Sequence, residues 1–440
     1  MKRDLARILI PFVYFIAGAS SLAGVAMTFY LKEDLHLSIA QGAMLGSLSI
    51  IPWSIKPLYG LLSDRIPVRG LRRKPYLFLS GILGAAGYFS MATWVHSFSG
   101  ALAATLISAL GFALADVIVD GIVAERSKTQ TEAGKLQSIC RAAIMTGSLI
   151  VAYSSGILTQ TIGARNVFWI TGSLPLLTSV LSLFIDESPV QMQHAMVRDL
   201  WMKLKAAMNK DLLMAIGFMF LWRATPNSGG SLNYYEIDVL GFTPEFFGRL
   251  SLIGSVMGIV GVVIFRKTLL TMSLRRLFFW VMMLSVILSL PTIGLVYGWY
   301  KPLGVSPQFF AMADTFISGP LSEIGFLPLL VLAARLCPAG IEATMFALLA
   351  SIMNIGLAVS DMGGALLVHA FHVNQATETL PADYSNLHIV LWIAILSSLL
   401  PWPLLRFIPE TRVESDMLPG APSLTQQLKS TADASKEEIV

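Results

Sequence analysis

Charged side chains are scarce in this sequence of 440 residues. Only 13% of them are Asp, Glu, Lys or Arg, about half of the share that is typical of soluble domains. Hydrophobic residues make up 55% of the chain, and long apolar runs recur along it. Because roughly 20 apolar residues cross a bilayer as one helix, the composition predicts an integral membrane protein.

Motifs for catalysis and metal binding are also lacking. Cys140 and Cys337 are the only cysteines and the six histidines are scattered, so we expect no disulfide framework, metal site or cofactor. The sequence has no H-E-x-x-H, G-x-S-x-G or P-loop motif, so an enzyme with catalytic residues is not indicated. The basic residues are spread over several loops without interleaved aromatics, which argues against nucleic acid as a partner.

Twelve apolar runs are long enough to span a bilayer, and they predict an all-α fold of twelve transmembrane helices. Most Lys and Arg residues fall in alternate loops, whereas the other loops hold only Lys32, Arg165, Arg249 and Lys301. Because Lys and Arg are retained on the cytoplasmic side, both termini are expected there. The runs lie at 8–31, 38–62, 75–95, 98–124, 134–161, 165–185, 211–238, 244–270, 275–299, 307–334, 341–371 and 386–408.

The runs divide into two halves of six, residues 1–188 and 211–408. When the second run is laid on the eighth, Gly60 aligns with Gly261, so the halves resemble repeats. A polar stretch at 189–210 is expected to be a cytoplasmic linker, either an amphipathic helix or a solvated chain, and the tail 409–440 is expected to be disordered. Repeated halves with a site between them are typical of secondary transporters.

Four charges fall inside apolar runs of the first half. Lys56 lies in "IIPWSIKPLYGLLSD", Asp116 and Asp120 share one helix face in "ADVIVDG", and Arg141 follows in the fifth run. At about 1.5 Å per helical residue, all four lie in one layer between the cytoplasmic surface and the midplane. Either they neutralise one another in a structural network, or the cations also bind an anionic substrate while an aspartate exchanges a proton.

The second half holds fewer such charges. Arg223 in "FLWRATPNSGG" is a further candidate for binding an anion, and the Pro and Gly residues after it predict an interrupted seventh helix. Glu323 in the tenth run is a third candidate for proton coupling, beside the two aspartates of the first half. Glu236 and Asp238 lie near the outer end of the seventh run and are expected to be solvated.

The loop "GLLSDRIPVRGLRRK" resembles the signature between the second and third spans of the major facilitator superfamily. The residues that match form the expected cytoplasmic gate: Gly60, Asp64, Arg65, Arg72 and Arg73. Three extra residues separate Arg65 from the next glycine relative to the usual spacing.

More specifically, "KPLYGLLSDRIPVRGLRRKPYL", "ADVIVDGIVAER" and "QSICRA" together resemble the folate–biopterin transporter family of that superfamily. The resemblance implies alternating-access transport of folates or pterins, coupled to protons, by a monomer in the plasma membrane or a plastid envelope. It places the family's lysine, aspartates and arginine on Lys56, Asp116, Asp120 and Arg141. All four are candidates for substrate binding, and either aspartate could bind the pterin ring or carry the proton. The alternatives are a carrier of the same superfamily for another organic anion or for S-adenosylmethionine.

Overall fold

The fold is all-helical, as expected. The computed structural model describes residues 6–126, 130–185, 187, 189, 210–265, 269, 272–337, 342–376 and 381–408, and these residues form helices and two isolated β-bridges but no strand. Nine of the described helices are long and apolar enough to cross a membrane. The predicted linker and tail lie outside the described residues, apart from residues 189 and 210.

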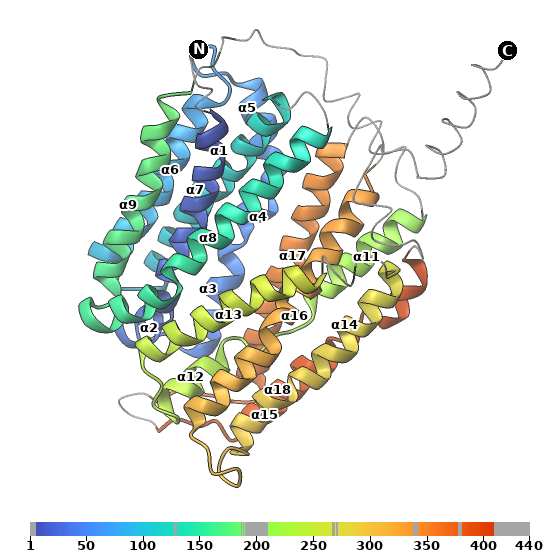
Figure 1. The fold of residues 1–440 in the computed structure, drawn as a ribbon. Coiled ribbons are helices and arrows are strands. Elements are labelled where there is room, and N and C mark those ends of the chain that lie inside the picture. The colour runs from blue at the N-terminus through green and yellow to red at the C-terminus, as the bar shows by residue number, and fades with distance from the viewer. Residues whose placement is uncertain are drawn as a thin grey trace, which may run out of the picture.

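The chain folds into two helical bundles that lie side by side (Figure 1). The first bundle contains α1 (Ala6–Ala19), α2 (Ala23–Phe29), α3 (Ile39–Ser49), α4 (Ile51–Ser54), α5 (Lys56–Arg65), α6 (Lys74–Thr93), α7 (Phe98–Arg126), α8 (Gln130–Ile162) and α9 (Ala164–Ser182). The second contains α11 (Lys210–Ala224), α12 (Ser231–Asp238), α13 (Pro244–Ile264), α14 (Leu274–Leu288), α15 (Leu290–Tyr297), α16 (Pro307–Arg335), α17 (Glu342–Ala370) and α18 (Leu387–Ser397). We call the end where α1 begins and α5 lies the near end, and the end with α12 and α15 the far end.

Several of the twelve predicted runs are broken helices, and two of these breaks lie near the predicted site residues. The run 38–62 forms α3, α4 and α5, and the run 211–238 forms α11 and α12 with residues 225–230 between them. The second break confirms the predicted interruption, since Gly229 and Gly230 have φ values of 59° and 77° there. An alanine at Gly229 would also bring its Cβ to 2.9 Å from the backbone of Gly364 in α17.

Prolines explain the first break. Pro57 has no N–H to donate to the carbonyl of Trp53, four residues earlier. The side chain of Asn354 in α17 donates to that carbonyl instead, at 2.9 Å. The second bundle therefore satisfies a backbone group that a proline of the first bundle leaves open, and Lys56 lies at the start of the helix that follows.

The two bundles approach most closely where glycines replace side chains. A Cβ built on Gly156 of α8 would lie 2.2 Å from the carbonyl oxygen of Pro244, and one on Gly248 of α13 would lie 2.8 Å from that of Tyr153. On the other side of the molecule, the Ser47 hydroxyl of α3 donates to the carbonyl of Ala358 in α17. The α8–α13 crossing lies toward the far end.

Candidate functional site

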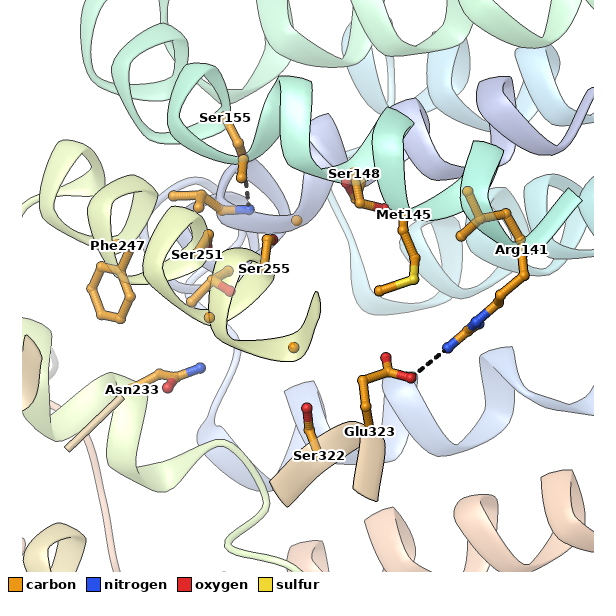
Figure 2. A pocket seen from close by; sticks show the side chains of 18 residues that line it. Arg141, Met145, Ser148, Ser155, Asn233, Phe247, Ser251, Ser255, Ser322 and Glu323 are labelled. Carbon is orange, nitrogen blue, oxygen red and sulfur yellow. Dashed lines mark hydrogen bonds and ion pairs between the residues drawn. The ribbon is translucent and has the colours of Figure 1, made fainter. Parts of the chain in front are cut away.

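A cavity of about 570 Å³ separates the two bundles beside the α8–α13 crossing. Ser155 and Arg141, both on α8, line it and lie 14 residues apart, which corresponds to about 21 Å of helix. Figure 2 shows serines from both bundles around it. The polar lining residues include Ser21, Thr28, Ser148, Ser155, Asn233, Ser251, Ser255 and Ser322.

An ion pair joins the bundles across this cavity. Nη2 of Arg141 on α8 lies 2.8 Å from Oε2 of Glu323 on α16, and Figure 2 shows the two side chains pointing toward each other. The Arg141 side chain is 40% exposed and that of Glu323 is 21% exposed. Both were predicted site residues, but the sequence did not pair them.

Phe326 holds a second guanidinium near the first. The Cζ atoms of Arg141 and Arg223 lie 5.9 and 5.7 Å from the centre of its ring. Arg223 lines a smaller cavity of about 210 Å³, and Ser322 lines both cavities. The Nε atoms of both arginines are buried and have no hydrogen-bond partner among the described residues. Two arginines with unpaired Nε donors thus lie within 6 Å of the centre of one ring.

The other predicted charges of the first half contact residues of the first bundle, and Asp120 among them is exposed. Nζ of Lys56 is 2.6 Å from Oδ2 of Asp116, and it also lies over the ring of Trp53. The hydroxyl of Tyr14 on α1 donates to Oδ1 of Asp120 at 2.6 Å. Neither aspartate nor Lys56 is among the residues that line the 570 Å³ cavity. The structure therefore brings Lys56 and Asp116 together, as the network interpretation expects, and sends Arg141 to a different acid.

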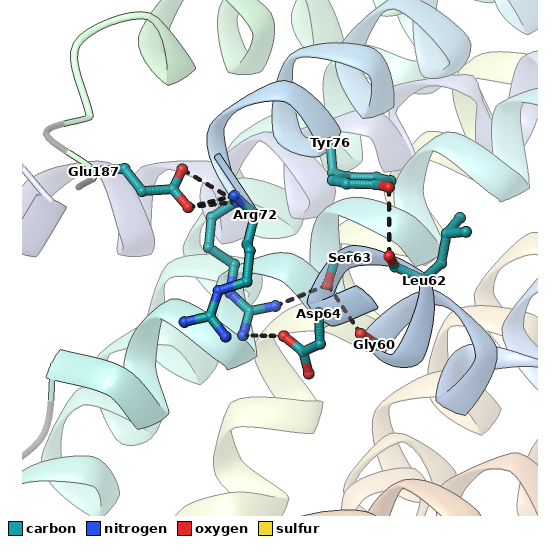
Figure 3. A network of polar contacts seen from close by, with 8 residues as sticks. Gly60, Leu62, Ser63, Asp64, Arg72, Tyr76 and Glu187 are labelled. Atoms are coloured by element: carbon teal, nitrogen blue, oxygen red, sulfur yellow. Dashed lines mark hydrogen bonds and ion pairs between the residues drawn. The ribbon is translucent and has the colours of Figure 1, made fainter. Parts of the chain in front are cut away.

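The predicted gate forms a polar network at the near end (Figure 3). Nη2 of Arg73 lies 2.9 Å from Oδ1 of Asp64, and its Nη1 donates to the Ser63 hydroxyl at 2.8 Å. Ser63 in turn donates to the carbonyl of Gly60. A Cβ on Gly121 of α7 would come to 2.9 Å from Cζ of Arg73, so glycine makes room for the guanidinium.

Glu187 completes this network, and the sequence did not indicate it. Its carboxylate accepts hydrogen bonds from the backbone N–H groups of Arg72, Arg73 and Lys74 at the start of α6. An acid at a helix start satisfies N–H groups that have no helical partner. Arg65, the remaining predicted gate residue, is exposed.

Three acids of the second half lie at the interruption and the far end, and two of them differ from the sequence prediction. Asp361 of α17 accepts a hydrogen bond from the Asn227 side chain in the break between α11 and α12. Asp238 is not solvated, because it pairs with Lys32 at 2.6 Å and accepts from the Tyr384 hydroxyl. Glu236 is only 6% exposed. The prediction that Glu236 and Asp238 are solvated is therefore wrong, since the second helix of the broken run folds inward.

Comparisons with known proteins find transporters among the relatives of this chain. A family model described as the BT1 family matches residues 17–420. The folate-biopterin transporter of Synechocystis sp. is 39% identical over 406 residues, which are 90% of this chain and 80% of that protein. The probable folate-biopterin transporter 2 of Arabidopsis thaliana is 29% identical, covering 91% and 81% of the two chains. Folate transporter 2 of Plasmodium falciparum is 27% identical, covering 80% and 78%.

Solved structures share the fold at low sequence identity. The nucleoside transporter NupG superimposes with a TM-score of 0.65 at 15% identity, covering 92% of this chain and 99% of its own. The D-xylose-proton symporter gives a TM-score of 0.63 at 14% identity, covering 92% and 97%. A likeness at this identity identifies the fold alone.

Proposed function

Because the chain belongs to the BT1 family, we propose that it is a secondary active transporter that carries folates or pterins by alternating access. Residues 1–188 and 211–408 would be two six-helix halves, with twelve spans and both termini in the cytoplasm. The names of the relatives support the class of substrate. The observation that carries the proposal is the Arg141–Glu323 ion pair, which crosses a cavity lined by both bundles.

The chemistry of the cavity suits a folate. Its glutamate tail offers carboxylates, for which Arg141 and Arg223 have unpaired Nε donors. The ring of Phe326 lies close to both arginines and is a candidate for contact with the aromatic part of the substrate. A carboxylate that binds Arg141 would compete with Glu323, so substrate binding would break this ion pair between the bundles.

Proton coupling follows from the same competition. Once Arg141 turns to the substrate, Glu323 loses its cation, so this acid is a candidate to carry the coupled proton. Asp116 and Asp120 remain the other candidates for the proton. Lys56, held by Asp116, would contribute to substrate binding only after that pair rearranges, as transport requires.

The two ends of the molecule suit the roles of gates. The glycine contact between α8 and α13, which brings the bundles together toward the far end, would form one gate. The network of Arg73, Asp64 and Glu187 fixes the loop before α6 at the near end, which would be the cytoplasmic side. We propose that the transporter works as a monomer in the plasma membrane or a plastid envelope.

Uptake of labelled folate into proteoliposomes tests the proposal, with and without an inward proton gradient and beside empty vesicles. Accumulation driven by the gradient would support both cargo and coupling. Exchange without accumulation would keep the cargo and remove the proton. No uptake by folded, reconstituted protein would reject folate, and the same assay would then be run with other organic anions and S-adenosylmethionine.

A further inference from the structure

Arg223 is a cation without a direct partner in the part of the chain that the structure describes. It lies in the last turn of α11, and its guanidinium makes no hydrogen bond and no ion pair with any described residue. Asp361 acts on it electrostatically but forms no ion pair with it, because the Asp361 carboxylate accepts from the Asn227 side chain. A charge inside a helical bundle is costly unless it meets an opposite charge, water or a ligand.

Packing fixes both ends of the Arg223 side chain. A Cβ added to Gly356 of α17 would lie 2.8 Å from Cβ of Arg223, so the two helices touch at this point. Two residues later, the carbonyl of Thr225 accepts from the Ser360 hydroxyl of α17 at 2.6 Å. At the other end of the side chain, Cζ lies 5.7 Å from the centre of the Phe326 ring of α16. The guanidinium is therefore held in place beside the smaller cavity of about 210 Å³.

The smaller cavity suits a carboxylate better than a pterin ring. Three of its four hydroxyl side chains already donate to backbone carbonyls of their own helices: Ser285, Ser322 and Ser398. The Arg223 guanidinium is thus its main source of free donors, and a guanidinium can give a carboxylate two parallel N–H bonds. A pterin also carries donors that need an acceptor. No acid is among the described residues that line the smaller cavity, whereas Glu323 lines the larger one.

The two arginines are close enough to hold one small molecule together. Cζ of Arg141 and Cζ of Arg223 each lie within 6 Å of the centre of the Phe326 ring, so they are less than 12 Å apart. The two carboxyl carbons of an extended glutamate are about 5 Å apart, and a bidentate contact adds about 4 Å at each end. Ser322, which is exposed, lines both cavities, so the cavities adjoin there. One glutamate can therefore reach both guanidinium groups.

We propose that Arg223 and the smaller cavity form a second carboxylate subsite, which selects substrates that end in two carboxylates on a short chain. Arg141 holds one carboxylate after it leaves Glu323, and Arg223 holds the other. The inference rests on the proposed function for the identity of the substrate, which is a folate with a free terminal glutamate. A pterin without glutamate has no carboxylate for either arginine, so Arg223 favours folates over simple pterins.

Binding of N-benzoylglutamate and its two amides to the purified protein tests the subsite, with calorimetry as the measurement. The α-amide and the γ-amide each replace one carboxylate with a neutral group of similar size. Each amide is expected to bind the wild type roughly 10- to 100-fold more weakly than the diacid. In Arg223→Gln, one of the two amides is expected to bind as well as the diacid while the other stays weaker, and Arg141→Gln should show the opposite pattern.

Controls separate a subsite from a structural role of Arg223. Arg165→Gln is the matched control, because Arg165 lines neither cavity, and it should keep the wild-type pattern. If Arg223→Gln does not fold, Arg223→Lys takes its place, since it keeps the charge but loses the bidentate contact and should reduce the difference between that amide and the diacid. Amides that lose the same factor in the wild type and in the folded Arg223 variant would overturn the proposal. So would a wild type that binds all three probes equally or does not bind the diacid.

Uptake of labelled folate is measured separately on the same proteins. Folate uptake by a wild type whose binding does not distinguish the diacid from its amides would keep the proposed function and overturn the subsite. The expected pattern of amide binding without folate uptake would keep the subsite and reject folate as the cargo. The two proposals therefore fail in different ways.

Discussion

Replacing Glu323 with Gln should tighten substrate binding rather than weaken it. In the structure Glu323 occupies Arg141 at 2.8 Å, in the position that we assign to a substrate carboxylate. The variant removes this competitor while it keeps the size and polarity of the side chain. If the acid were only a structural partner of Arg141, the same change would loosen the cavity and weaken binding.

The expected size follows from the exposure of the pair. The side chains are 40% and 21% exposed, so solvent screens the attraction and the pair is worth about 1 kcal/mol. Removing the competitor should thus lower the Kd for folate roughly fivefold. Arg141→Ala removes charge-assisted hydrogen bonds worth about 1.5 to 3 kcal/mol, so it should raise the Kd roughly 10- to 100-fold.

Titration of the purified variants with folate, by calorimetry or by quenching of tryptophan fluorescence, measures these changes. Asp34→Asn is the matched control, since it breaks an ion pair with Arg165 at 3.2 Å that lies within the first bundle, and neither residue lines the cavity. The double variant of Arg141 and Glu323 should bind like Arg141→Ala. Weaker binding by Glu323→Gln, of the size seen for Arg141→Ala, would refute the competition between acid and substrate.

Three further substitutions test the scaffold around the site. Lys56→Ala should abolish uptake and lower stability by about 2 to 3 kcal/mol, because it leaves a partly buried Asp116 unpaired. Adding Asp116→Asn to this variant should restore the melting temperature but not uptake. Restored uptake in the double variant would count against a role of Lys56 in binding. Asn354→Ala should cost about 1 to 3 kcal/mol in thermal melts by leaving the Trp53 carbonyl without a donor. Glu187→Gln should cost about 1 kcal/mol by weakening the start of α6, and an unchanged melt would contradict that role.

The sequence determined the class of the protein because few backbone structures are stable inside a bilayer. An apolar run of about 20 residues must satisfy its own backbone, which only a helix can do in this composition. The break after Arg223 could also be read from Pro226, Gly229 and Gly230, since proline and glycine act on the backbone locally. The contact between Asp64 and Arg73 is open to the same kind of reasoning, because these residues are close in the chain, whereas Glu187 lies 114 residues from Arg73.

The pairing of charges could not be read from the sequence. Depth along a helix placed Lys56, Asp116, Asp120 and Arg141 in one layer, but depth says nothing about which helices are neighbours. Packing put Arg141 opposite Glu323, 182 residues away, and Asp120 beside the hydroxyl of Tyr14. Serines and one phenylalanine gave no signal of a cavity, because such residues are common in any membrane helix.

Glu236 shows the same division most clearly. Its position near the end of an apolar run predicted that the side chain is exposed to water, as it would be at the end of a straight helix. The chain breaks at 225–230, and Glu236 on α12 is only 6% exposed. The sequence by itself determined which segments are helices in a membrane, because that depends on local composition; only the tertiary structure decided which charges meet, because that depends on how the helices pack.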